Sequence, residues 1–208
     1  MDGGGARTTR IEIRRGALEG ERPAVAEVYW HAFAQKVEPY VGSRDAGLII
    51  MAESFRLDRM ILALRDGAVV GVAGLDYGTT TFVSPSLVTC HRLLGLRRGI
   101  GAYLGLRFFH GGKSAGQLRI DSLAVAPNER GSGVGRLLLH EVFALARERG
   151  FTSVILEVVD SNPRARNLYE LLGFRSTAVY RYPWLTRRQG FTGHTVMVKE
   201  LAERGRVE

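Results

Sequence analysis

The apolar positions of this chain follow two periods, which divide it into strand-like and helix-like segments. Alternation, or a short apolar run between turn residues, is typical of strands. Apolar residues three or four positions apart are typical of a helix with one buried face. The strand pattern occurs at residues 10–15, 60–66, 68–77, 118–126, 153–159, 174–182 and 194–201. The helical pattern occurs at residues 21–34, 46–55, 133–149 and 163–172.

Turn and capping residues stand at several of these boundaries. Asp66-Gly67 separates two strand segments and favours a tight hairpin. Asn162 followed by Pro163 is typical of a helix start, and Gly173 is typical of a helix end. The order strand, two helices, hairpin and then strand-helix-strand-helix-strand-strand predicts an α/β (α+β) fold, with helices against a mixed sheet.

The same pattern predicts one domain over residues 10–202 of the 208-residue chain. Residues 1–9 and 203–208 are expected to be tails, the first of them flexible. Residues 78–116 break the strand and helix pattern with many glycines, Pro85 and a basic, leucine-rich stretch. We expect this segment to be a helical insertion.

Charge adds a second constraint, because the formal net charge is +8 and most of the basic residues are arginines. A guanidinium group matches phosphate geometry, so either a nucleic acid or a phosphorylated cofactor would explain the bias. Arginines on an ordinary solvated surface would explain it equally well.

The cysteine count, the histidine spacing and the hydropathy argue against a disulfide-bonded, metal-binding or membrane-spanning protein. Cys90 is the only cysteine, so no internal disulfide can form, and a reducing compartment fits. The histidines show no helical pair at metal-ligand spacing, so we predict no metal. The most apolar stretch, residues 87–109, contains four arginines and a histidine, which is too much charge for a membrane span. With no signal-peptide pattern, these features predict a cytoplasmic protein with no membrane partner.

A glycine-rich turn lies between the strand at 118–126 and the helix at 133–149. Gly131, Gly133 and Gly135 allow backbone amides to approach a ligand at a helix start, where an anion is favoured. Arg130 and Arg136 add positive charge, so a pyrophosphate would fit. An ordinary strand-to-helix loop is the alternative. A dinucleotide fingerprint fails because it would need glycine at position 136.

Two motifs in this region resemble the acetyl-CoA-binding core of the GNAT superfamily of N-acetyltransferases. The pyrophosphate-loop signature Arg/Gln-x-x-Gly-x-Gly/Ala is matched by Arg130, Gly133 and Gly135. The second signature, Asn-x-x-Ala-x-x-Leu-Tyr-x-x-x-Gly-Phe, is matched by Asn162, Ala165, Leu168, Tyr169, Gly173 and Phe174. The resemblance covers about a quarter of the chain. It implies a mostly antiparallel sheet of about seven strands and acetyl transfer from acetyl-CoA to a primary amine of a small molecule, peptide or protein.

The resemblance also implies roles for particular residues. Tyr169 would protonate the coenzyme sulfur, although alone it could equally be a core residue. Asn162 would contact the coenzyme as well as cap a helix. The residues implied in coenzyme binding are Leu123, Ala124, Val125, Arg130, Gly131, Ser132, Gly133, Val134, Gly135, Arg136, Asn162, Ala165 and Tyr169.

Asp121, in the motif strand, is the first candidate for the base that deprotonates the amine. Asp121 lies two residues before Leu123, so alternation would place both side chains on one face, near the acceptor. An ion pair with Arg119 or a turn cap is an equally good account of Asp121. Glu157 is the second candidate base. An acceptor cleft could be lined by Tyr29, Trp30, Phe33, Tyr103, Phe108, Phe109, Tyr182 and Trp184.

Two other functions compete with this prediction. A basic nucleic-acid-binding module would use clusters such as Arg97-Arg98 and Arg187-Arg188, but the chain lacks a recognition-helix motif and interleaved aromatic residues, so nucleic acid is not favoured. A non-catalytic protein that binds acyl-CoA for regulation is the other alternative, and Tyr169 argues against it. A second copy of the chain is a further candidate partner.

Overall fold

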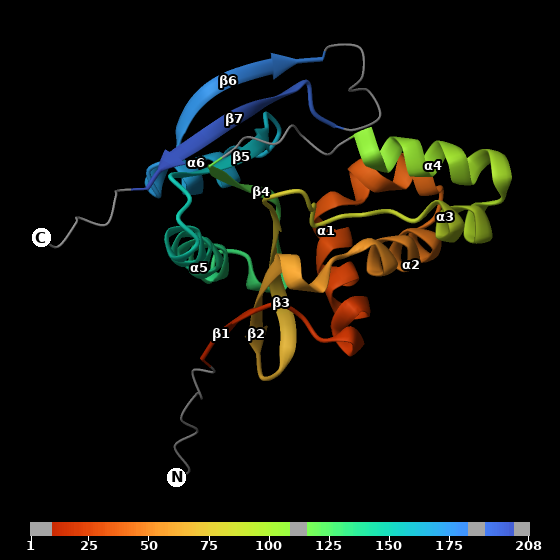
Figure 1. Ribbon diagram of the computed structural model, residues 1–208, viewed down its shortest axis with the longest axis horizontal. Helices are drawn as coiled ribbons and strands as arrows, with labels where there is room; N and C mark the ends of the chain where they lie inside the picture. The colour runs from red at the N-terminus through yellow and green to blue at the C-terminus, as the bar shows by residue number, and fades with distance from the viewer. Residues whose placement is uncertain (1–9, 109–115, 183–189, 202–208) are drawn as a thin grey trace, which may run out of the picture.

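The computed structural model describes residues 10–108, 116–182 and 190–201 (Figure 1). The predicted tails at 1–9 and 203–208 lie outside these residues, as do Phe109 and Trp184. The strands are β1 (Glu12–Arg15), β2 (Met60–Arg65), β3 (Ala68–Asp76), β4 (Gln117–Val125), β5 (Ser153–Val159), β6 (Arg175–Arg181) and β7 (Gly193–Glu200). The helices are α1 (Arg22–Val41), α2 (Arg44–Ser54), α3 (Leu87–Leu94), α4 (Leu96–Phe108), α5 (Val134–Glu148) and α6 (Pro163–Leu171).

Each strand and helix predicted from the apolar pattern is present, and one prediction of length is wrong. The first helix continues past residue 34 to Val41, because buried apolar side chains recur at Val37 and Val41. It ends at Gly42, whose φ of 77° is in the left-handed region that glycine adopts without strain. Ser43 then caps α2 by accepting a hydrogen bond from the amide of Ala46.

Within the described residues the strands form one sheet of seven, in the order β1-β2-β3-β4-β5-β7-β6. Only β4 and β5 pair in parallel, and every other neighbouring pair is antiparallel. The predicted mixed, mostly antiparallel sheet of about seven strands is therefore confirmed.

Two apolar clusters cover the two faces of this sheet. Strand β2 shows the division, because Ile61 and Ala63 belong to the cluster under α5 and α6, while Met60, Leu62 and Leu64 belong to the cluster under α1 and α2. This is the alternation expected of a strand buried on both faces. Figure 1 shows α5 and α6 on one side of the central strands and α1 and α2 on the other.

The segment predicted as a helical insertion contains α3 and α4, which pack against each other and against α1 and α2 (Figure 1). Their buried positions include Cys90, Ala102 and Leu106, which join the cluster under α1 and α2. The insertion therefore extends this side of the molecule away from β4.

The sheet is interrupted at Asp121 in β4. On one side, Gly74 of β3 pairs with Ser122 and Leu75 pairs with Ile120, so Asp121 is the extra residue of a β-bulge. On the other side, the parallel pairing of β4 with β5 ends, among the described residues, at Ile120 and Leu156. Beyond this point β4 continues with β3 and β5 continues with β7, so an opening forms between β4 and β5.

Candidate functional site

The edge of β4 that faces this opening carries backbone donors. The amide of Ala126 donates to the carbonyl of Val70 in β3 at 2.9 Å. Because amides alternate in direction along a strand, those of Ser122 and Ala124 also point toward β3. The amides of Leu123 and Val125 therefore point away from β3, into the opening.

The glycine-rich turn lies at the end of the same strand, where the sequence predicts it. Gly131 and Gly133 have φ values of 92° and 91°, which only glycine adopts readily. Gly133 occupies the N-cap position of α5, and no side chain of the described residues caps the helix there. A Cβ added at Gly133 would have no described heavy atom within 4 Å. The start of α5 thus presents uncapped amides to open space, which favours an anion.

One predicted phosphate donor in this turn is already used. The amide of Ser132 donates to the carbonyl of Glu129 at 3.3 Å, and the Ser132 hydroxyl donates to the same carbonyl at 2.7 Å. The carboxylate of Glu129 in turn accepts two hydrogen bonds from Arg65, at 2.8 and 2.9 Å. Ser132 therefore stiffens the turn, which leaves the amides of Gly131, Gly133 and the first turn of α5 as the donors.

The three arginines around the turn have different contacts. Arg130 donates to the carbonyls of Val125 and His31, both at 3.3 Å, so it ties the end of β4 to α1. The Nε of Arg136 lies 3.3 Å from the Nε2 of His140, one turn along α5.

Arg164 was not among the predicted residues, yet a guanidinium nitrogen of Arg164 lies 2.7 Å from the position of a Cβ at Gly131. Its charge is therefore directly beside the turn. Its only signal in the sequence is its place two residues after the capping Asn162.

Helix α6 is positioned as its motif predicts. The Asn162 side chain accepts from the amide of Ala165 at 3.1 Å, which confirms the predicted cap. Ala165 and Leu168 pack on the cluster under α5, and the Leu168 side chain lies 3.4 Å from the Cβ position of Gly135. The motif therefore places α6 against the start of α5.

Tyr169 lies on the buried side of α6 and is 7% exposed. Its ring packs edge-on against Phe174, with the centroids 5.8 Å apart. Burial raises the pKa of the Tyr169 phenol to about 12, so the hydroxyl stays protonated at neutral pH. Tyr169 is thus a core residue whose phenol remains a proton donor.

Asp121 lines a cavity of about 60 Å³ on the α1 side of the sheet. The walls of the cavity are Tyr29, Phe33, Lys36, Val37, Met51, Val83, Leu106 and Asp121. Burial, together with the nearby carboxylate of Asp76, raises the pKa of Asp121 to about 7. Lys36 and Arg119 act in the opposite direction, and Glu157 raises it slightly. A carboxyl group with this pKa can exchange protons near neutral pH.

The predicted shared face of Asp121 and Leu123 is wrong. Leu123 packs against the cluster under α5, whereas Asp121 lines the cavity under α1. The β-bulge is the physical reason, because one extra residue in β4 reverses the alternation between the two positions.

Glu157, the second predicted base, is held by other groups. Arg119 donates to its carboxylate at 2.9 Å, and the His194 imidazole lies 3.6 Å from the other oxygen. Because Ile120 and Leu156 form the last pair of β4 and β5, Asp121 and Glu157 are the first residues of the two strands beyond it. The two carboxylates therefore stand at the mouth of the opening, and Asp121 is the one that reaches the cavity.

The aromatic residues predicted to line a cleft separate in the structure. Tyr29 and Phe33 line the cavity, while Trp30 is buried in the cluster under α1 and α2. Tyr103 lies beside Arg107, and Tyr182 stacks on His194. Phe108 ends α4.

Among the described residues, no group of three or more histidine, cysteine, aspartate or glutamate side chains is placed to hold a metal ion. No helix in this part of the chain has the length and apolarity needed to cross a membrane.

Comparisons with known proteins agree with this geometry. The family model of the acetyltransferase (GNAT) family matches residues 23–174. The chain is 41% identical over 58 residues to the streptothricin acetyltransferase of Streptomyces lavendulae, covering 28% of this chain and 31% of that protein. It is 36% identical over 64 residues to the probable N-acetyltransferase family 8 member 5 of Mus musculus, covering 31% of this chain and 28% of that protein. The matches thus span about a third or less of these relatives.

The fold is also found in solved structures. The chain superposes on the Salmonella typhimurium protein yncA, whose structure holds its cofactor acetyl-CoA, with a TM-score of 0.59 and 20% identity. The superposition covers 94% of this chain and 96% of that one. At this identity the likeness establishes the fold.

The raised pKa of Asp121 predicts a pH-dependent stability. Its pKa of about 7 in the folded protein lies above the ordinary value of 3.8. The stability that this proton confers is therefore fully present below about pH 4 and is lost as the pH rises to about 7. The asparagine side chain of the Asp121→Asn variant cannot ionise. We therefore expect the Tm of this variant minus the Tm of the wild type to increase between pH 4 and 7 and to stay constant above pH 7. Thermal unfolding monitored by circular dichroism measures this.

Asp160→Asn is the matched control. Hydrogen bonds from Thr192 lower the pKa of Asp160, so the stability it contributes is present above about pH 4 and lost below it. The Tm of this variant minus the Tm of the wild type should therefore decrease as the pH rises. A pH-independent Tm difference for Asp121→Asn would contradict the raised pKa of Asp121.

Proposed function

We propose that this chain, which belongs to the acetyltransferase (GNAT) family, is an acyltransferase that binds acetyl-CoA at the opening between β4 and β5. It then transfers the acetyl group by direct attack of a primary amine. The observation that carries this proposal is the order of three features along β4 and the turn after it: Asp121 with its cavity, the outward amides, and the uncapped start of α5. These features supply a base, donors for a carbonyl oxygen and a site for an anion.

The residues of the turn fit the pyrophosphate of coenzyme A. The amides of Gly131, Gly133, Val134, Gly135 and Arg136 would hold it, with the guanidinium of Arg164 beside them. The helix dipole and uncapped amides each favour negative charge at this end of α5. Open space at Gly133, where any side chain would stand in the way, supports this fit. Arg130 and Ser132 support the turn, and Asn162 with Ala165 fixes the start of α6.

When bound, the coenzyme supplies a thioester, whose carbonyl carbon accepts the amine. The outward amides of Leu123 and Val125 are suited to polarise the carbonyl oxygen. Ala124 lies between them, with its amide directed to β3. Donors that meet developing negative charge contribute strongly to catalysis, and removing one typically lowers the rate by about 10²–10³.

Two side chains handle the protons. An alkyl ammonium has a pKa of about 10.4 and must lose a proton before it can attack. Asp121, with a pKa of about 7, is ionised at slightly alkaline pH and can take that proton inside a mainly apolar cavity. As the carbon–sulfur bond breaks, the Tyr169 phenol supplies a proton to the departing thiolate. Its pKa of about 12 keeps it protonated until then.

The proposed cofactor and the single cysteine support a proposal for the cellular setting. Cys90 is fully buried in the cluster under α1 and α2, and its thiol suits a reducing compartment. We therefore propose action in the cytoplasm, on a small-molecule or peptide amine.

The first test of this function is coenzyme binding. We expect titration calorimetry with coenzyme A to give a 1:1 complex, and Gly133→Ala to weaken it at least tenfold, because a Cβ would enter the space of the pyrophosphate. Gly150→Ala is the matched control, since Gly150 also has a positive φ, open surroundings and a place at the other end of α5. Absent heat for the wild type, with binding to DNA that weakens steeply with salt, would instead favour a nucleic-acid-binding module.

The second test is turnover. Thiol release from acetyl-CoA in the presence of an amine should show kcat rising with pH around an inflection near 7, where Asp121 loses its proton. Asp121→Asn should lower kcat about 10²–10⁴-fold and remove this inflection, while coenzyme binding is retained. Tyr169→Phe should lower kcat and leave the inflection in place. Coenzyme binding without thiol release for any amine would favour a non-catalytic acyl-CoA-binding protein.

A further inference from the structure

The cavity beside Asp121 contains two charged side chains of opposite sign in otherwise mainly apolar walls. Asp121 comes from β4 and Lys36 from α1, while Tyr29, Phe33, Val83 and Leu106 are among the other walls. Only three lysines occur in the chain, and the other basic residues are arginines. Lys36 is the one lysine or arginine among the described residues that line this small, largely apolar space.

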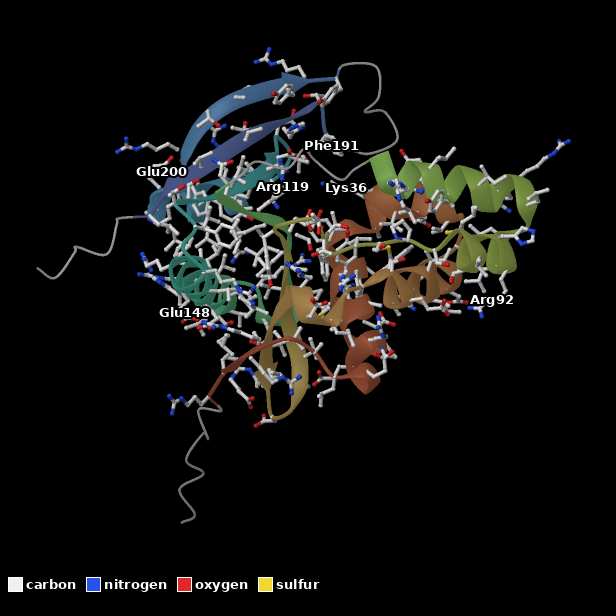
Figure 2. The ribbon with its side chains drawn as sticks, viewed as in Figure 1. Lys36, Arg92, Arg119, Glu148, Phe191 and Glu200 are labelled. Carbon is white, nitrogen blue, oxygen red and sulfur yellow. The ribbon has the colours of Figure 1, made fainter. Side chains whose placement is uncertain are left out.

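The ammonium group of Lys36 is held by aromatic rings. It lies 5.6 Å from the centroid of Phe33 and 5.7 Å from that of Phe191. Figure 2 shows Lys36 and Phe191 side by side where α1 faces the ends of β5 and β7. Within the described residues, no hydrogen bond or ion pair is formed by this ammonium. Burial lowers the pKa of Lys36, opposed by the carboxylates of Asp121 and Glu157.

The acidic side chains near Lys36 have other partners or another proposed role. Glu157 is bound by Arg119 and approached by His194. Asp76 is buried and accepts a hydrogen bond from the amide of Phe82 at 2.6 Å. Asp121 exchanges a proton during the proposed reaction. Because a cation in an apolar wall is stabilised most by a hydrogen-bonded anion, Lys36 is suited to bind the carboxylate of a ligand.

We propose that the acceptor is a small amine that also carries a carboxylate, with an apolar substituent, as in an apolar α-amino acid. This inference rests on the proposed function. The amino group lies beside Asp121, the carboxylate accepts hydrogen bonds from Lys36, and the substituent contacts the apolar walls. Lys36 thus distinguishes such an acceptor from polyamines, which it repels, and from peptides, whose first carboxylate is replaced by an amide.

The test compares acceptors of equal size that differ in the carboxylate. Leucine, leucinamide and isopentylamine share the amine and the branched chain. We expect the wild type to favour leucine over the other two by about 10- to 100-fold in kcat/KM, the size of one hydrogen bond to a charged group. Methionine and phenylalanine, each with its amide, extend the comparison to other apolar side chains.

The Lys36→Met variant assigns this preference to Lys36. We expect the ratio of kcat/KM for leucine to that for isopentylamine to fall close to one, mainly through KM for leucine, and Lys36→Arg to restore part of it. The ratio cancels any effect of Lys36 on the pKa of Asp121, because both acceptors use the same base. Lys199→Met is the matched control. Lys199 also lies over a phenyl ring, that of Phe143 at 5.3 Å, but does not line the cavity, so the ratio should not change.

Several results would overturn the inference. Equal turnover of leucine, leucinamide and isopentylamine would do so, as would a Lys36→Met variant that loses activity on all three equally. Preference for the phosphonate analogue of leucine over leucine itself would contradict a carboxylate acceptor. Failure of the proposed function looks different, because then no amine in the panel releases thiol, whether or not calorimetry detects coenzyme binding.

Discussion

The end of backbone pairing between β4 and β5 is the constraint on which the site depends. Two parallel strands held together over their whole length would satisfy each other's amides and leave no room for a ligand. Here the pairing ends at Ile120 and Leu156, and the bulge at Asp121 marks the same level on the other side of β4. The amides of β4 beyond this level are thereby directed into an opening.

Charge is arranged along this opening in a consistent order. The uncapped start of α5 and the guanidinium of Arg164 make one end suited to an anion. The other end contains a carboxyl group whose pKa burial raises to about 7. The bulge connects these features, because it turns Asp121 to the α1 side while Leu123 remains on the α5 side. One irregular residue therefore joins coenzyme binding to a cavity for the acceptor.

Local signals in the sequence predicted much of this arrangement. The apolar periods gave the strands and helices, and the glycine turn and the Asn162 cap lie where their motifs indicated. The bulge was not predicted, because alternation assumes a regular strand, and the side of Asp121 was wrong as a result. Lys36 and Arg164 were not predicted, because α1 brings Lys36 to the cavity and α6 brings Arg164 to the glycine turn only in the folded protein. The acceptor cavity could not be predicted for the same reason, since its walls come from five separate segments.

Hydrogen exchange at the amides of β4 tests the central claim most directly. In the free protein, measured by NMR, the amides of Ser122 and Ala124 should exchange slowly, because they face β3, and those of Leu123 and Val125 should exchange fast. Saturation with acetyl-CoA should slow Leu123 and Val125 selectively. Coenzyme binding that leaves these two amides unchanged, or Leu123 and Val125 already protected in the free protein, would contradict the account.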